Sequence, residues 1–227
     1  MKFKQARKFK ANHGSVTGYY PFCGELIPYE STLERDFIIR ESFFVNTKTI
    51  SAQPVTIEFQ KNGRTHPYTP DFFVAYQTPN AYGRTGMFVE VKPKSEWRKH
   101  HKQWLCKWAA MKAFATKLNC SFRIYDEDRI RDFTLANINQ LLRFKSMHVE
   151  PFMLEKVTRI TSQAHAISIN DLACSLEGSL HALHTGETGT KFDVYRIIWH
   201  ALANRILDCD IANYDVMHGE TKVWLAK

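Results

Sequence analysis

Three strand-like segments followed by one long amphipathic helix limit the folds open to this chain. Residues 55–59 are rich in β-branched and aromatic side chains, and Asn62-Gly63 is a strong signal for a hairpin turn. The chain is then predicted to return antiparallel through residues 68–76. A third strand over residues 87–92 ends at Pro93, which cannot donate a ladder hydrogen bond. This order predicts a sheet built largely from neighbouring segments.

A long helix is predicted after this third strand, with Ser95 as its cap. Large side chains recur in it at steps of three and four, as in a helix that packs one face on a core. Residues 121–125 predict a short strand, and the capping box Ser31-Thr32-Leu33-Glu34 predicts an earlier helix. The fold class is therefore α/β, a mixed sheet flanked by helices. The stripe of the long helix comprises Trp97, His101, Trp104, Leu105, Trp108, Met111, Ala115 and Leu118.

The pattern of predicted elements changes after about residue 150. Residues 152–165 look helical, and capping boxes at Ser168-Ile169-Asn170-Asp171 and Thr190-Lys191-Phe192-Asp193 predict two more helices. Residues 222–225 predict a closing strand, and the set is typical of a winged helix that docks a partner protein or binds DNA. The predicted domains are 1–148, which begins with a basic arm at 1–14, and a winged-helix-like domain at 149–227.

Composition limits the class of protein further. The net charge of +8 favours an anionic partner, most often nucleic acid, and the 44% hydrophobic content is typical of a globular chain. No apolar run could cross a bilayer and no signal peptide is evident, so we expect a cytoplasmic protein without a membrane partner. Five cysteines without a C-x-x-C pair favour reduced thiols over disulfides or structural zinc.

Two carboxylates and one ammonium are predicted to meet at one end of the sheet. Glu90 and Lys92 alternate with Val91 along a strand, so their side chains point to one face. Asp71 on the preceding strand reaches that face if the two strands pair. Such a patch suits metal-dependent hydrolysis of a phosphodiester, with Mg²⁺ (or Mn²⁺) on the carboxylates and the Val91 carbonyl, and Lys92 beside the attacking water. A surface strand with paired charges is the alternative.

Basic side chains suggest where a nucleic acid would lie. Lys8 and Lys10 belong to the N-terminal arm, and Arg98, Lys99 and Lys102 lie at the start of the long helix. We predict that these five contact DNA phosphates. The alternative is a solvated tail and a solvated helix face.

The spacing of Pro70-Asp71 and Glu90-Val91-Lys92 is the signature of the restriction-endonuclease-like superfamily. More specifically, several segments within residues 25–145 resemble the TnsA-type endonuclease subunits of heteromeric cut-and-paste transposases. These segments are Ser31-Thr32-Leu33-Glu34-Arg35-Asp36-Phe37, Gln53-Pro54, Tyr68-Thr69-Pro70-Asp71-Phe72, Val89-Glu90-Val91-Lys92, Ile124-Tyr125-Asp126-Glu127 and Asn137-Ile138.

The resemblance implies both a site and a role. Glu34, Asp71 and Glu90 would bind Mg²⁺ and Lys92 would assist the water, although Glu34 can equally serve only as a helix cap. Some family members carry Gln where this chain has Glu90. Such subunits cut the 5′ (non-transferred) strands at transposon ends, beside a DDE transposase and an ATPase regulator. A bacterial, nucleoid-associated setting follows, in some systems with RNA-guided targeting. The alternatives are an independent nuclease of the same fold and a non-catalytic DNA-binding subunit.

Overall fold

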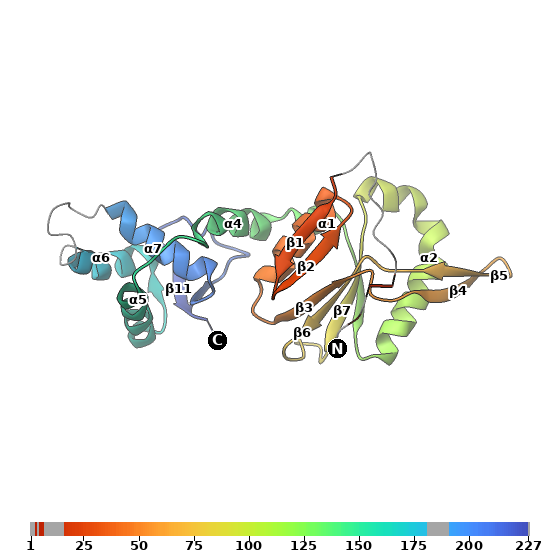
Figure 1. Ribbon diagram of the computed structural model, residues 1–227, viewed down its shortest axis with the longest axis horizontal. Helices are drawn as coiled ribbons and strands as arrows, with labels where there is room; N and C mark the ends of the chain where they lie inside the picture. Colours follow the sequence, from red (N-terminus) through yellow and green to blue (C-terminus); the bar gives the residue numbers. More distant parts are fainter. Residues whose placement is uncertain (1–2, 4, 7–15, 181–190, 227) are drawn as a thin grey trace. The chain divides into compact units, whose positions relative to one another are not determined.

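A computed structural model describes residues 3, 5–6, 16–180 and 191–226 of the protein. The chain forms two compact units, Met1–Asp132 and Phe133–Lys227 (Figure 1). The division therefore falls before the boundary at residue 148 that the sequence suggested. Among the described residues, none of the helices is both long and apolar enough to cross a membrane.

The first unit is built on a four-stranded mixed sheet in the order β3-β6-β7-β8. The pairs β3–β6 and β6–β7 are antiparallel, whereas β7 and β8 are parallel. A parallel pair needs a crossover connection, and α2 supplies it. The predicted mixed sheet is thus present. The strands are β3 (Thr47–Ala52), β6 (Phe72–Tyr76), β7 (Gly86–Val91) and β8 (Ser121–Tyr125), and the crossover helix is α2 (Lys94–Lys117).

Helices cover both faces of this sheet (Figure 1). On one face α1 (Thr32–Phe43) stacks Phe37 on Phe72 of β6, with 5.3 Å between ring centroids. The next strand residue, Phe73, points to the opposite face and joins the core formed with α2. Alternation along β6 therefore places one aromatic side chain in each layer.

The long helix departs from its prediction in two places. Trp108, Met111 and Ala115 are buried as expected, but Leu105 is 55% exposed, so its assignment to the core was wrong. Ser95 is not the cap, because the helix begins at Lys94. The Lys94 N–H is instead satisfied by a carboxylate oxygen of Glu127, at 2.8 Å, from the segment after β8.

Two hairpins accompany the sheet. The pair β1 (Gly18–Phe22) and β2 (Glu25–Tyr29) was not predicted. The pair β4 (Ile57–Lys61) and β5 (Arg64–Tyr68) turns at Asn62-Gly63 as predicted, with φ of 51° and 70°. However, residues 68–76 do not form one strand, because Pro70 interrupts the ladder. β5 therefore remains with β4, outside the main sheet (Figure 1), and β6 pairs with β3 and β7.

The second unit combines helices with a small antiparallel sheet in the order β10-β11-β9. The Ser168 hydroxyl accepts from the Asp171 N–H at 3.1 Å, which confirms this capping box; Thr190 lies outside the described residues. The helix predicted over residues 152–165 and the strand predicted over residues 222–225 are confirmed, as α5 and β11. The elements, after the short α3 (Glu127–Ile130) of the first unit, are α4 (Phe133–Leu141), the 3₁₀ helix η1 (Leu142–Phe144), α5 (Pro151–Ala164), β9 (Ile167–Ser168), α6 (Ile169–Leu180), α7 (Lys191–Ala203), β10 (Leu207–Cys209) and β11 (Lys222–Leu225).

Asn137 ties α4 to the segment between β10 and β11. It is fully buried, and its amide donates to the carbonyls of Ile211 and Tyr214 at 2.9 and 2.8 Å. We expect Asn137→Ala to lower the free energy of unfolding by at least about 2 kcal/mol, because both carbonyls lose their donor in the interior. Asn139→Ala, an exposed position on the same helix, should change it by less than about 0.5 kcal/mol. Urea denaturation measures both, and equal effects would contradict the prediction.

Candidate active site

Asp71, Glu90 and Lys92 meet where β6 begins and β7 ends. Phe72 pairs with Val89, so Asp71 comes opposite Glu90 across the antiparallel ladder. The Lys92 ammonium lies 3.6 Å from Asp71 Oδ2 and 3.5 Å from Glu90 Oε1. The strand pairing on which the predicted patch depended is therefore present, and these three side chains are brought together.

The backbone of β7 fixes the Asp71 carboxylate. The Val91 N–H donates to Asp71 Oδ2 at 2.8 Å. Because the N–H and C=O of one strand residue point to the same edge, the Val91 carbonyl is also directed past the end of β6, toward Asp71. Gln53, with φ of 47°, donates its N–H to the Asp71 carbonyl at 2.7 Å and its side-chain amide to Glu30 at 3.0 Å. Asp71 is thus held from both sides.

Tyr68 and Lys107 contact Glu90, although neither was predicted from the sequence to belong to the site. The Glu90 side chain is only 2% exposed, and a buried carboxylate is unfavourable unless it is paired. The Tyr68 hydroxyl donates to Glu90 Oε2 at 2.6 Å, and the Lys107 ammonium donates to Oε1 at 3.0 Å. Lys107 follows Trp104 by three residues, so a cation beside the aromatic stripe was the available signal.

Glu34 caps its own helix as predicted, except that its carboxylate accepts from the residue before the N-cap Ser31. Its N–H donates to the Ser31 hydroxyl at 3.1 Å, and its Oε2 accepts from the Glu30 N–H at 2.8 Å. Burial is the main cause that raises the pKa of Glu34. The Glu34 carboxylate nevertheless lies near enough to Asp71 and Lys92 to affect the pKa of both. The Glu34 carboxylate therefore lies beside the cluster, while its hydrogen bonds are made at the N-terminus of its own helix.

The cluster has unusual proton affinities. Burial raises the pKa of Asp71 to about 7, and the neighbouring carboxylates of Glu90 and Glu34 act in the same direction against the lowering effect of Lys92. The Asp71 carboxylate in turn is the main cause that raises the pKa of Lys92. Burial, followed by the Glu90 carboxylate, raises the pKa of Tyr68, which therefore remains a neutral donor. Such perturbed groups in one place are typical of functional sites.

The oxygen atoms of this cluster fit a hard divalent cation. Asp71 and Glu90 already share one cationic group, the Lys92 ammonium, and the Val91 carbonyl faces the same end of the sheet. Mg²⁺ takes one or two carboxylates and keeps several waters, so a third carboxylate is not required. Within the described residues, no three His, Cys, Asp or Glu side chains are grouped to hold a metal. Any such site would therefore consist of two carboxylates completed by backbone and water.

The predicted DNA contacts are only partly described. Arg98, Lys99 and Lys102 are exposed on the first turns of α2 and form no ion pair with the described residues. Lys8 and Lys10 lie outside the residues that the structure describes. An exposed, uncompensated basic surface on α2 is what a phosphate backbone requires.

The fold and the cluster together define a class of protein. A mixed sheet flanked by helices, with Asp71, Glu90 and Lys92 at adjoining strand ends, fits a restriction-endonuclease-like fold. The chain carries a TnsA-like endonuclease N-terminal domain, because residues 45–127 match the family model described as "TnsA-like endonuclease N terminal". The match confirms the resemblance to TnsA-type endonucleases and supports a nuclease role. It includes the cluster but not Glu34. A comparison with curated proteins gave no match.

Proposed function

We propose that this protein is the Mg²⁺-dependent endonuclease subunit of a transposase, which cuts the 5′ non-transferred strands at transposon ends. The observation that carries the proposal is the Asp71–Glu90–Lys92 cluster inside a TnsA-like endonuclease domain. A DDE transposase would process the other strands, and an ATPase regulator would link both proteins to the target. The products would carry 5′-phosphate and 3′-hydroxyl ends.

Each residue of the cluster has a separate role in the proposed reaction. When bound, Mg²⁺ supplies an acidified water and neutralises charge on the phosphate. Asp71, Glu90 and the Val91 carbonyl would hold it, and Lys92 would orient the attacking water and stabilise the developing charge. Tyr68 and Lys107 fix the Glu90 carboxylate. Arg98, Lys99 and Lys102 would hold the DNA backbone beside the cluster.

The second unit supports a separate docking role. It runs helix, strand, helix, helix, strand, strand from α5 to β11, with a three-stranded antiparallel sheet. We propose from this order that the unit is a winged helix, in which α7 would be the recognition helix. We propose that the unit docks a partner of the transposition complex, with DNA as the alternative ligand.

Metal affinity should depend on pH. A proton on Asp71 competes with the cation, and the pKa of Asp71 is about 7. Mg²⁺ affinity is therefore expected to rise about tenfold between about pH 6 and pH 8, as this carboxyl ionises. Calorimetric titration of the full chain at both pH values measures it. An affinity equal at the two values would show that Asp71 does not ligate the metal.

Strand-specific cleavage tests the proposed role. A transposon-end duplex labelled on either strand is incubated with Mg²⁺ and the protein, alone and with the transposase and the ATPase. We expect 5′-strand cuts only in the full mixture. Cleavage of plain duplex by the protein alone would instead identify an independent nuclease.

A non-catalytic DNA-binding subunit is the second candidate. The observation that favours it is the engagement of both Glu90 oxygens by protein donors, together with the lack of a three-residue metal group among the described residues. Absence of Mg²⁺ and Mn²⁺ binding, together with absence of cleavage in the full mixture, would select this candidate.

A further inference from the structure

The outer edge of β8 is open. β8 ends the main sheet, and its Tyr125 carbonyl accepts from the Lys92 N–H at 2.9 Å on the side of β7. By the alternation of a parallel ladder, Phe122 and Ile124 then direct their backbone groups away from the sheet. The Ile124 carbonyl accepts from the Arg129 guanidinium at 2.9 Å. The N–H groups of Phe122 and Ile124 have no partner among the described residues, so this edge of β8 offers two free backbone donors.

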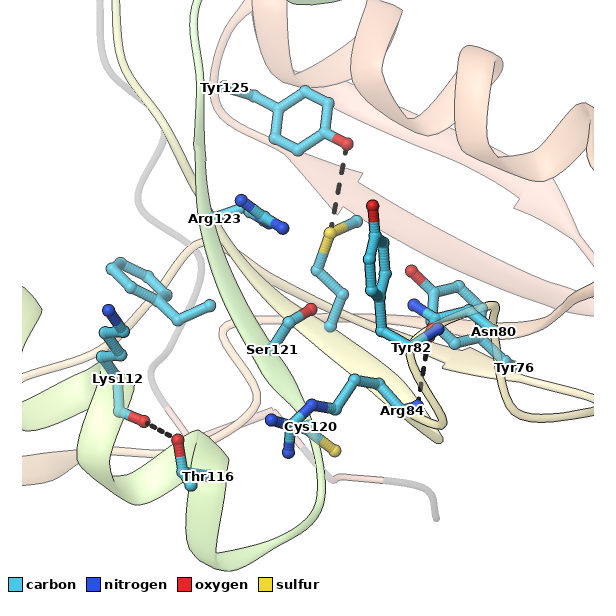
Figure 2. A pocket seen from close by; sticks show the side chains of 12 residues that line it. Tyr76, Asn80, Tyr82, Arg84, Lys112, Thr116, Cys120, Ser121, Arg123 and Tyr125 are labelled. Atoms are coloured by element: carbon cyan, nitrogen blue, oxygen red, sulfur yellow. Dashed lines mark hydrogen bonds between the residues drawn. The ribbon is translucent and has the colours of Figure 1, made fainter.

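Hollows flank this edge on both sides. One, of about 470 Å³, is lined by Tyr82, Arg84, Ser121 and Arg123 among others, and Figure 2 shows the Ser121 hydroxyl and the Tyr82 ring around it. The other, of about 440 Å³, lies between β8 and α2. Its walls are mainly apolar: Trp97, Leu105, Trp108, Ala109, Phe122 and Ile124. Arg123 lines both hollows, which therefore adjoin at β8; together they are called the β8 groove below.

The two hollows match the two faces of an added strand. In a strand paired with β8, successive side chains would point alternately to the two faces of the sheet. One series would enter the apolar hollow beside α2, where Leu105 is 55% exposed. The other series would lie over the hollow that contains Arg84 and Arg123. The groove therefore suits a segment in which two kinds of side chain alternate.

Charge defines the second kind of side chain. Arg84, Lys112 and Arg123 line the groove, and none of them forms an ion pair with the described residues. Asp126 is the one described carboxylate in the lining, and it already accepts from the Trp97 indole and the Arg129 N–H, each at 3.2 Å. Unneutralised cations on the rim favour acidic residues in the bound segment.

We propose that the edge of β8 is a docking site for an extended segment of a partner protein, in which large apolar residues alternate with Asp or Glu. Strand pairing with Phe122 and Ile124 supplies the backbone contacts, the α2 hollow takes the apolar residues, and Arg84 and Arg123 take the carboxylates. The unpaired strand amides and the apolar hollow favour a peptide over DNA, whose phosphates would use only the cations.

A labelled peptide of about ten residues, alternating Leu and Glu, tests the proposal by fluorescence anisotropy with the full chain. Leu105→Glu and Arg123→Glu are each expected to weaken binding at least about tenfold. Leu26→Glu and Arg64→Glu are matched controls, because both positions are exposed and each change alters the charge equally. The peptide affinity of both control variants should stay within about twofold of that of the unaltered chain. No binding to the unaltered chain, or equal losses in variants and controls, would overturn the proposal.

Backbone pairing has its own readout. Only alternate amides of an added strand face β8. Two peptides, one N-methylated at its Leu positions and one at its Glu positions, should therefore behave differently. One of them should lose binding, and the other should keep it. Amide exchange at Phe122 and Ile124 should slow in the complex. Equal tolerance of both methylated peptides without slower exchange would overturn strand addition. A single-stranded oligonucleotide that displaces the peptide and is weakened by Leu105→Glu would assign the groove to nucleic acid instead.

Discussion

Cleavage by the assembled proteins is expected to fall by at least about 10³-fold when Asp71 is replaced by Asn or Lys92 by Ala. Asn keeps the size of Asp71 and can still accept the hydrogen bond from the Val91 N–H, so the main loss is the negative charge that would hold the metal. Lys92→Ala removes an ammonium that lies near both carboxylates. End-labelled transposon ends measure the rate. Unaltered rates in both variants would contradict the assigned active site.

The same Asp71→Asn change should stabilise the metal-free protein. Burial raises the pKa of Asp71 from 3.8 to about 7, so the folded state binds the proton more tightly than the unfolded state does. The stability this proton contributes is complete below about pH 4 and is lost as the pH rises through 7. Asn avoids that loss, and at pH 8 the gain should be about 1 to 2 kcal/mol.

A matched variant separates this effect from the loss of any carboxylate. The Asp128 side chain is 59% exposed and pairs with Lys94. Asp128→Asn should leave cleavage unchanged and alter the free energy of unfolding by less than about 0.5 kcal/mol. Thermal unfolding at about pH 5 and pH 8 compares the variants. If Asp71→Asn destabilised the protein at pH 8, Asp71 would be a structural ion-pair residue.

Replacement of Lys107 by Met should lower the cleavage rate about 10- to 100-fold, as is typical of groups that orient a metal ligand. Met keeps the length and apolar stem of Lys107 but removes the ammonium that lies 3.0 Å from Glu90 Oε1. The Glu90 carboxylate keeps Tyr68 and Lys92 but becomes less firmly positioned. The free energy of unfolding should also fall, by about 1 to 3 kcal/mol, since one partner of a buried charge is lost.

The control for this variant lies on the same helix. Lys117 is exposed in the last turn of α2, and Lys117→Met should leave the cleavage rate unchanged and cost less than about 1 kcal/mol. The dependence of rate on Mg²⁺ distinguishes positioning from DNA binding. A loss of rate that persists at saturating Mg²⁺ and DNA fits positioning of Glu90, whereas full recovery at high DNA concentration would make Lys107 a DNA contact.

Local sequence patterns predicted much of the architecture. Alternation placed Glu90 and Lys92 on one face of a strand, the Asn62-Gly63 turn defined a hairpin, and the capping boxes at Ser31 and Ser168 marked helix starts. Each of these depends on residues a few positions apart, whose geometry the backbone itself restricts. Asp71 and Lys92 were found in the same way, because their strands pair across a short connection.

Contacts between distant segments needed the tertiary structure. Pro70 separates β5 from β6, so β6 pairs with the unpredicted β3 rather than continuing the hairpin. Glu127 reaches the N-terminus of α2 in place of Ser95, and Leu105 is exposed in the hollow between α2 and β8. Each of these features depends on which distant segment lies opposite, and no local sequence pattern encodes that neighbour.

For the active site, the sequence by itself determined the charged residues: Asp71 beside the Glu90-Val91-Lys92 strand. Only the tertiary structure decided how these charges are held. Tyr68 and Lys107 reach Glu90 from another strand and from α2, and Glu34 is engaged by its own helix N-terminus. The physical reason is burial. Packing between the sheet and its helices removes water from the carboxylates, and this desolvation, which depends on the whole fold, raises the pKa of Asp71 to about 7.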